Sequence, residues 1–210
     1  MINAYNDIYL DDARDNLAVI IDYSVNWLKI PLANFWNMFV LSPICQKIER
    51  GQFDVVSGKS GIEIVDDLVL NHIDLDYYSF ERSREYWLGD YLAYFQWRTS
   101  ASFAFINKYV KIEELLSLYN PYHEMDVEQF VDRVIEIIKS RKKNTNLEIA
   151  RKYAKMSRSE LSKISGVPVR TIEQYEQGYK DINKANVSYV MSMAKALNTN
   201  VSNLLEISNL

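Results

Sequence analysis

The segment from Ser157 to Gly178 constrains the fold of this chain more than any other part of its sequence. Ser157-Arg-Ser-Glu160 has the pattern of a capping box, in which serine and glutamate satisfy free backbone N–H groups at a helix start. Ser165-Gly166-Val167 predicts a three-residue turn, because glycine adopts positive φ without steric cost. Pro168 fits the start of a further helix, since its fixed φ and missing N–H are tolerated there. The spacing therefore predicts two short helices joined by a tight turn.

The second helix of this pair is predicted over 169–176, and helical periodicity continues on both sides of the pair. An amphipathic helix marked by Leu147, Ala150, Tyr153 and Ala154 comes before it, and helices over 184–197 and 201–205 follow. The apolar positions predicted to face the core of the last 70 residues are Leu161, Ile164, Ile172, Tyr175, Val187, Val190, Met191, Ala194 and Leu197.

Charge and aromatic content both change near residue 140. Residues 141–210 hold 12 Lys/Arg against 6 Asp/Glu, whereas residues 1–140 hold 12 against 22. Of the 27 aromatic side chains, 23 precede residue 141. These shifts predict an acidic, aromatic-rich domain over 1–140 and a basic domain over 141–210. A small basic module on an acidic body is typical of a tethered nucleic-acid binder; on charge alone, a solvated helix end at Arg141-Lys142-Lys143 is the alternative.

Two short helices joined by a glycine-containing turn form a helix-turn-helix, whose second helix can enter the major groove of DNA. Glutamine can form two hydrogen bonds with adenine, arginine can do so with guanine, and valine or threonine can contact the thymine methyl group. We expect base contacts from Val169, Arg170, Thr171 and Gln174. We expect phosphate contacts from Arg158, Lys180, Lys184 and Arg151. The alternative is a small helical bundle with ordinary surface charges.

The residues 161–178, 194–197 and 201–205 resemble the Xre/Cro-type helix-turn-helix family of bacterial and phage regulators. The resemblance extends over 146–206 and implies a five-helix lambda-repressor-like domain. It places the four base-contacting candidates on base-reading positions, Arg158 and Gln177 on phosphate-contacting positions, and Glu176 on a structural acidic position. The chain departs from the family pattern at Pro168, where a small hydroxyl residue is usual, and at Arg158, where glutamine is common.

The first 140 residues are predicted to be helical as well, so the fold class is all-α. Helices are predicted over 11–25, 44–50, 60–70, 84–97 and 112–119. A further helix is predicted to begin at Pro31, with Phe35, Met38 and Phe39 on one face, and another to begin at a capping box at Asp126. The aromatic stretch over 86–97 is predicted to form core or interface, with a planar ligand as the alternative. Segments 60–64, 86–97 and 115–119 are similar to an uncharacterised region of Firmicute regulators, often paired with suspected toxins.

We find no residue constellation for an enzyme, a cofactor or a metal site. The chain has 1 Cys and 2 His. The group His123, Glu124 and Asp126 is predicted to be a loop before a helix. No apolar stretch reaches the roughly 18 residues of a membrane helix, and the start lacks a secretory pattern, so we expect a cytoplasmic location.

The sequence thus predicts a sequence-specific regulator that binds double-stranded DNA, a repressor or autorepressor acting as a homodimer. The alternative is an antitoxin whose N-terminal domain neutralises a toxin or other partner protein and whose C-terminal domain autoregulates the operon.

Overall fold

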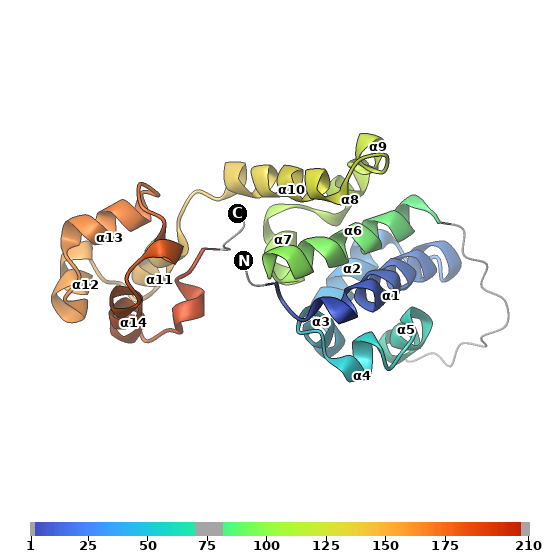
Figure 1. Ribbon diagram of the computed structural model, residues 1–210, viewed down its shortest axis with the longest axis horizontal. Helices are drawn as coiled ribbons and strands as arrows, with labels where there is room; N and C mark the ends of the chain where they lie inside the picture. The colour runs from blue at the N-terminus through green and yellow to red at the C-terminus, as the bar shows by residue number, and fades with distance from the viewer. Residues whose placement is uncertain (1–2, 70–81, 207–210) are drawn as a thin grey trace. The chain divides into compact units, whose positions relative to one another are not determined.

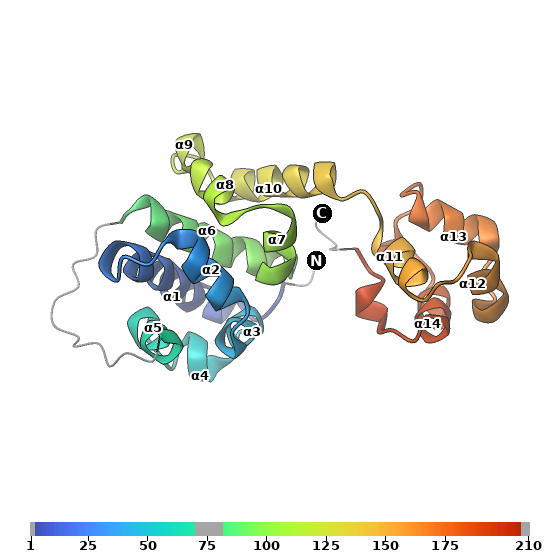
Figure 2. The same ribbon diagram turned by 180° about the vertical axis from the view of Figure 1, so that it is seen from behind.

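The computed structural model describes residues 3–69 and 82–206, and every regular element in that part of the chain is a helix (Figures 1 and 2). The predicted all-α class is therefore confirmed. Residue 70, where one helix was predicted to end, lies outside the described residues. The chain divides into two compact units: the N-terminal unit ends at Ile138 and the C-terminal unit begins at Lys139. No helix among the described residues is long and apolar enough to span a membrane.

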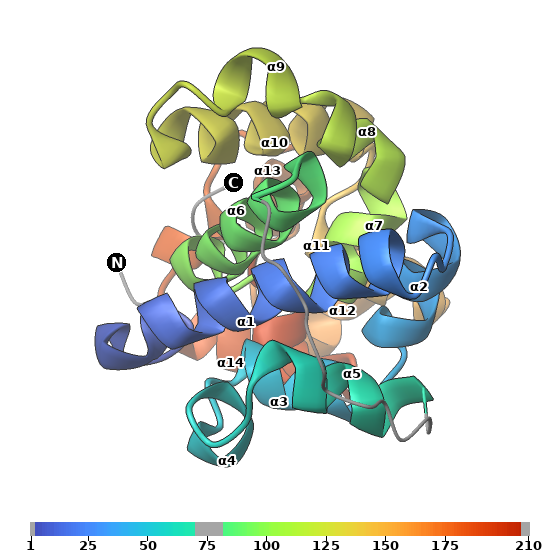
Figure 3. The ribbon, with the colours of Figure 1, turned by 90° about the vertical axis from the view of Figure 1, so that its right-hand side faces the viewer.

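The N-terminal unit is built around α1 (Leu10–Asp22), which continues into a π-helical turn over Tyr23–Trp27. Helix α1 lies between α6 (Arg84–Thr99) and α5 (Gly61–Val69), as Figures 1 and 3 show. Its buried face holds Ala13, Leu17, Ala18, Ile20 and Ile21. These residues recur at helical spacing, so one apolar stripe packs against both neighbours.

Helices α1 and α6 run antiparallel and approach each other closely at Gly89. Arg14 pairs with Asp90 near one end of the contact, and the Ser83 hydroxyl donates to Asp22 near the other. A Cβ atom on Gly89 would lie 2.4 Å from the carbonyl oxygen of Leu17. Glycine is required here because backbone, rather than a movable side chain, occupies that space.

Further helices complete the N-terminal unit: α2 (Leu32–Val40), α3 (Pro43–Glu49), α4 (Phe53–Val56), α7 (Phe103–Tyr109), α8 (Ile112–Ser117) and α9 (Tyr119–Tyr122), with a 3₁₀ turn over Asp7–Tyr9. Helix α10 (Val127–Arg141) belongs to this unit up to Ile138, and its last three residues belong to the C-terminal unit. The Trp36 and Phe103 rings meet edge to face at 5.4 Å, which joins α2 to α7. Met38, predicted on the inner face of α2, is exposed instead. Helices α4, α7 and α9 were not predicted from the sequence.

The C-terminal unit contains α11 (Asn146–Tyr153), α12 (Arg158–Ser165), α13 (Val169–Glu176) and α14 (Val187–Ala196), with 3₁₀ turns over Ile182–Lys184 and Val201–Asn203. Its core includes Leu147, Leu161, Val167, Ile172, Met193 and Leu204. The predicted bounds of α13 are confirmed.

The predicted start of α14 was wrong, and so was the predicted burial of Ile164, Val187 and Met191. Helix α14 begins at Val187 rather than at 184, because the Asn186 side chain accepts the N–H of Ser188 and caps the helix there. Val187 is 69%, Met191 58% and Ile164 61% exposed. The buried stripe of α14 is instead Val190, Met193, Ala194 and Leu197. This i, i+3, i+4, i+7 spacing centres the buried stripe on a side of the helix that is turned away from Val187 and Met191. Tyr153 is exposed as well.

Candidate nucleic-acid interface

The turn between α12 and α13 has the geometry predicted from its sequence. The Ser157 hydroxyl accepts the N–H of Glu160 at 3.2 Å, and the Glu160 carboxylate accepts the N–H of Ser157 at 2.7 Å. Both halves of the capping box are therefore present. Gly166 has φ +72° and donates its N–H to Ser162, which ends α12. Pro168 is the N-cap residue of α13.

Helix α13 has one buried and one solvent-facing side. Ile172 and Tyr175 are buried, so the helix is fixed against the core. The four candidate base-contacting residues lie on the remaining surface: Val169 and Arg170 are exposed, and Thr171 and Gln174 are partly exposed. Three of the four, Val169, Arg170 and Thr171, lie in the first turn of α13, the end that a recognition helix presents to base edges.

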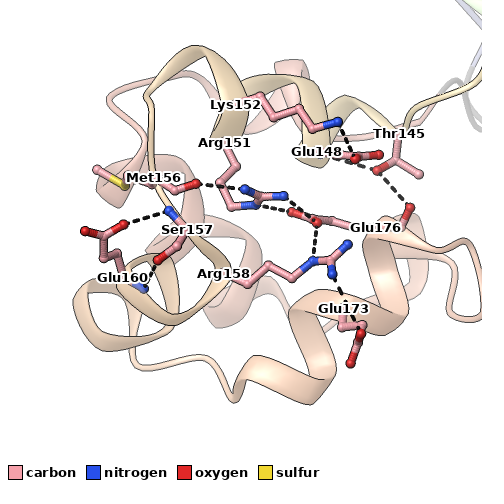
Figure 4. Close-up of polar contacts among 10 residues, drawn as sticks. All are labelled: Thr145, Glu148, Arg151, Lys152, Met156, Ser157, Arg158, Glu160, Glu173 and Glu176. Carbon is pink, nitrogen blue, oxygen red and sulfur yellow. Dashed lines mark hydrogen bonds and ion pairs between the residues drawn. The ribbon is translucent and has the colours of Figure 1, made fainter.

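A buried carboxylate holds three helices of the C-terminal unit together. The Glu176 side chain is 0% exposed and receives two hydrogen bonds from Arg151, Nε to Oε1 at 2.6 Å and Nη2 to Oε2 at 2.9 Å. The Nε atom of Arg158 donates to the same carboxylate at 2.7 Å. Figure 4 shows both guanidinium groups converging on Glu176. Since these residues lie on α11, α12 and α13, the network fixes the orientation of α13.

The electrostatics of this network keep Glu176 ionised. Burial is the largest single influence on the pKa of Glu176 and raises it, but hydrogen bonds and charge from Arg151 and Arg158 outweigh burial. The pKa of Glu176 therefore lies below its ordinary value. The hydrogen bond to Glu176 also raises the pKa of Arg151.

The expectation that Arg151 contacts phosphate was wrong. Arg151 is buried, and its third side-chain nitrogen, Nη1, donates to the carbonyl oxygen of Met156 at 2.7 Å. Arg151 therefore has a structural role inside the unit. Its partner is 25 residues away in the sequence, so no local spacing signals the pair.

Of the four residues expected to contact phosphate, Arg158 begins α12, and Gln177, Lys180 and Lys184 follow α13. Arg158 is 35% exposed in its side chain, and its Nη1 lies 3.7 Å from Glu173. The Gln177 amide donates to Glu173 at 3.4 Å. Lys180 and Lys184 are exposed, and the Lys184 ammonium lies 3.9 Å from Asp181. Arg158 thus has a structural partner, while Lys180 and Lys184 are exposed between α13 and α14, Lys184 at the end of the 3₁₀ turn over Ile182–Lys184.

A family model described as helix-turn-helix matches residues 147–204. Residues 147–204 are a helix-turn-helix domain of the Xre/lambda-repressor-like type. The match supports a DNA-binding transcription regulator. No significant match was found among curated proteins or among solved structures. Within the described residues, no group of three or more His, Cys, Asp or Glu side chains is arranged to hold a metal ion around the helix-turn-helix domain or elsewhere.

Proposed function

We propose that this chain is a sequence-specific repressor or autorepressor that inserts α13 into the major groove of double-stranded DNA. The observation that supports it most directly is the surface of α13. In a helix-turn-helix domain, that helix leaves Val169, Arg170, Thr171 and Gln174 on its solvent side while the buried Glu176 network fixes its orientation. These are side chains with hydrogen-bonding and methyl groups suited to base edges.

Affinity in this proposal comes from phosphate contacts of Arg158, Gln177, Lys180 and Lys184 around the base-reading helix. The regulator acts as a homodimer, with its two recognition helices on half-sites about 34 Å apart. The N-terminal unit supplies dimerisation or binds a partner protein.

Removing the base-reading amide should reduce sequence preference. For Gln174→Ala we expect about a 10-fold to 100-fold loss of affinity on the selected site and little change on a scrambled duplex, because bidentate base pairing discriminates by roughly 1–3 kcal/mol. Fluorescence anisotropy on both duplexes measures the two affinities. Equal losses on the two duplexes would show that Gln174 does not read a base.

Removing the exposed lysines should weaken all duplexes alike. For Lys180→Ala combined with Lys184→Ala, we expect the slope of log affinity against log salt to become shallower by about 1 per lysine. The control is Lys195→Ala, an exposed lysine on α14 outside the proposed set, whose slope should match wild type. An unchanged slope in the double variant would remove both lysines from the interface. Arg158→Ala is a poorer test because it also leaves Glu176 with one partner fewer.

An antitoxin is the second candidate, favoured by the 22 Asp/Glu against 12 Lys/Arg in residues 1–140, which suit a basic partner surface. A gel shift on the DNA upstream of its own coding region, with and without the product of the adjacent gene, separates the two. A repressor binds alone and is unaffected by the neighbour, whereas an antitoxin changes its DNA binding when the neighbour is added.

A further inference from the structure

The N-terminal unit contains a pocket of about 600 Å³ that the proposed function does not use. Helix α1 contributes Asp11, Arg14 and Asp15 to its lining, and the part contributed by α6 and α9, here called the aromatic wall, is largely aromatic. The aromatic wall consists of Tyr86, Trp87, Tyr91, Tyr119 and His123, the last of which directly follows α9. A volume of this size lies within the range of small-molecule sites.

The charges of the pocket favour a cation. Its lining holds three aspartates and two arginines. Arg14 is neutralised by Asp90, to which it donates from Nε at 2.5 Å and from Nη2 at 3.0 Å. This leaves Asp11 and Asp15, both exposed, against Arg82 at the same pocket, so the lining has a net negative charge.

Two hydroxyl groups of the aromatic wall, those of Tyr86 and Tyr91, are left as hydrogen-bond acceptors. The Tyr86 hydroxyl donates to Asp15 at 3.2 Å, and the Tyr91 hydroxyl donates to the carbonyl oxygen of Met125 at 3.2 Å. Nδ1 of His123 lies 2.9 Å from the carbonyl oxygen of Tyr119, and its Nε2 lies 3.6 Å from a carboxylate oxygen of Glu124. With their hydrogens already engaged, the two tyrosine hydroxyls complement a ligand that carries donors, whereas the buried Nε1–H of Trp87 has no acceptor among the described residues.

The aromatic rings pack against one another and add a second attraction for positive charge. The Trp87 ring meets Tyr119 edge to face at 5.3 Å, and Tyr119 stacks on His123 at 4.2 Å. Trp87 also packs against Phe130 of α10 at 5.4 Å. Aromatic faces attract ammonium and guanidinium groups through the ring quadrupole.

We propose that this pocket binds an organic cation, an amidinium, guanidinium or ammonium group on a small planar or alkyl body. The aspartates of α1 accept its hydrogen bonds, and the rings of α6 and α9 cover its apolar part. The same chemistry has two sources, a free small molecule or an arginine side chain of another protein. The site is independent of the DNA interface, so its test does not depend on DNA binding.

Calorimetric titration of the full-length protein with benzamidine tests the site, with benzamide as the neutral isostere. We expect benzamidine to bind about tenfold more tightly than benzamide, because a charge-assisted hydrogen bond contributes roughly that factor. Equal binding of the two compounds, or binding of neither, would overturn the proposal.

Two variants and one control locate the binding. Asp15→Asn should weaken benzamidine about tenfold, and Tyr119→Leu about threefold through loss of a ring face. Asp132→Asn removes an exposed carboxylate on α10 away from the pocket and should leave the affinity at the wild-type value. If Asp15→Asn keeps the wild-type affinity, or if Asp132→Asn lowers it equally, benzamidine binds by diffuse charge and the pocket is not its site.

Two further probes identify the source of the cation. Agmatine represents a free small molecule, and the blocked peptide acetyl-Gly-Arg-Gly-amide represents a partner side chain. Tighter binding of agmatine supports a small effector, and tighter binding of the peptide supports a partner's arginine. The circular dichroism melting curve of each variant shows whether its fold is intact. If Tyr119→Leu is unfolded, the benzamidine affinity of Asp15→Asn alone tests whether benzamidine binds in the pocket.

Discussion

Replacing Glu176 with glutamine is expected to lower the free energy of unfolding of the C-terminal unit by about 3 kcal/mol, since removing one partner of a buried ion pair leaves an uncompensated charge. Arg151 is buried and directs two hydrogen bonds at the carboxylate, while Arg158 adds a third. In the Glu176→Gln variant, two guanidinium groups face a neutral amide. The three helices that meet at this point lose their common partner.

Urea unfolding of the full chain measures this effect. The 4 Trp of the chain (Trp27, Trp36, Trp87 and Trp97) all lie in the N-terminal unit, so tryptophan fluorescence follows that unit and circular dichroism follows both. Glu176→Gln should lower the urea midpoint of the C-terminal unit, which only circular dichroism detects, and leave the fluorescence transition of the N-terminal unit unchanged. Glu173→Gln is the matched control on the same helix. Its carboxylate is 43% exposed and 3.7 Å from Arg158, so the expected loss is below about 0.5 kcal/mol. Equal losses in the two variants would contradict the structural role of Glu176.

The same network predicts the acid sensitivity of the C-terminal unit. The pKa of Glu176 is lower in the folded state than its ordinary value of 4.5. A carboxyl group with a lowered folded-state pKa stabilises the fold at pH values above 4.5, and the stabilisation is lost as the pH falls through the folded-state pKa. Wild type should therefore lose stability below about pH 4.5 more steeply than Glu176→Gln does. Parallel pH profiles would show that Glu176 is not the group responsible.

Gly89→Ala should lower the free energy of unfolding of the N-terminal unit by about 3 kcal/mol, which is the upper end of the range usual for overpacked cores. The added Cβ would lie 2.4 Å from the Leu17 carbonyl oxygen and 2.5 Å from the Ala18 Cα, so α1 and α6 have to separate. Helix propensity alone predicts the opposite sign, because alanine stabilises a helix interior by about 1 kcal/mol relative to glycine. Tryptophan fluorescence during urea unfolding reports this unit directly.

Gly166→Ala is the comparison for Gly89→Ala. Nothing lies within 4 Å of its added Cβ, and its φ of +72° alone is strained, so the expected loss is about 1 kcal/mol in the C-terminal unit. Its fluorescence transition should coincide with that of wild type. An unchanged or increased stability of Gly89→Ala would show that α1 and α6 do not pack as closely as the structure indicates.

Local signals explain why the helix-turn-helix could be predicted from the sequence. The capping box at Ser157, the positive φ of Gly166 and the proline before α13 each act within a few residues, and all three are present in the structure. The stripe of α14 was misassigned because Val187 and Met191 share helical spacing with Val190 and Ala194. Only the packing of Met193 against the core decides between the two faces.

Long-range contacts explain what the sequence could not show. Glu176 meets Arg151 across 25 residues, and the close approach at Gly89 joins segments more than 70 residues apart. The pocket in the N-terminal unit combines side chains from α1, α6 and α9, and the aromatic stretch over 86–97 indicated only part of one wall. No periodicity encodes such pairings, because each depends on how the helices pack.

The most direct test of the DNA-binding proposal is selection of duplexes from a random double-stranded library by the full-length protein, followed by anisotropy titration of the selected duplex at two salt concentrations. We predict that one motif is enriched, that its affinity falls steeply with salt, and that Gln174→Ala no longer prefers it over a scrambled duplex. If no motif is enriched and no duplex binds at low salt, α13 does not act as a recognition helix in this protein.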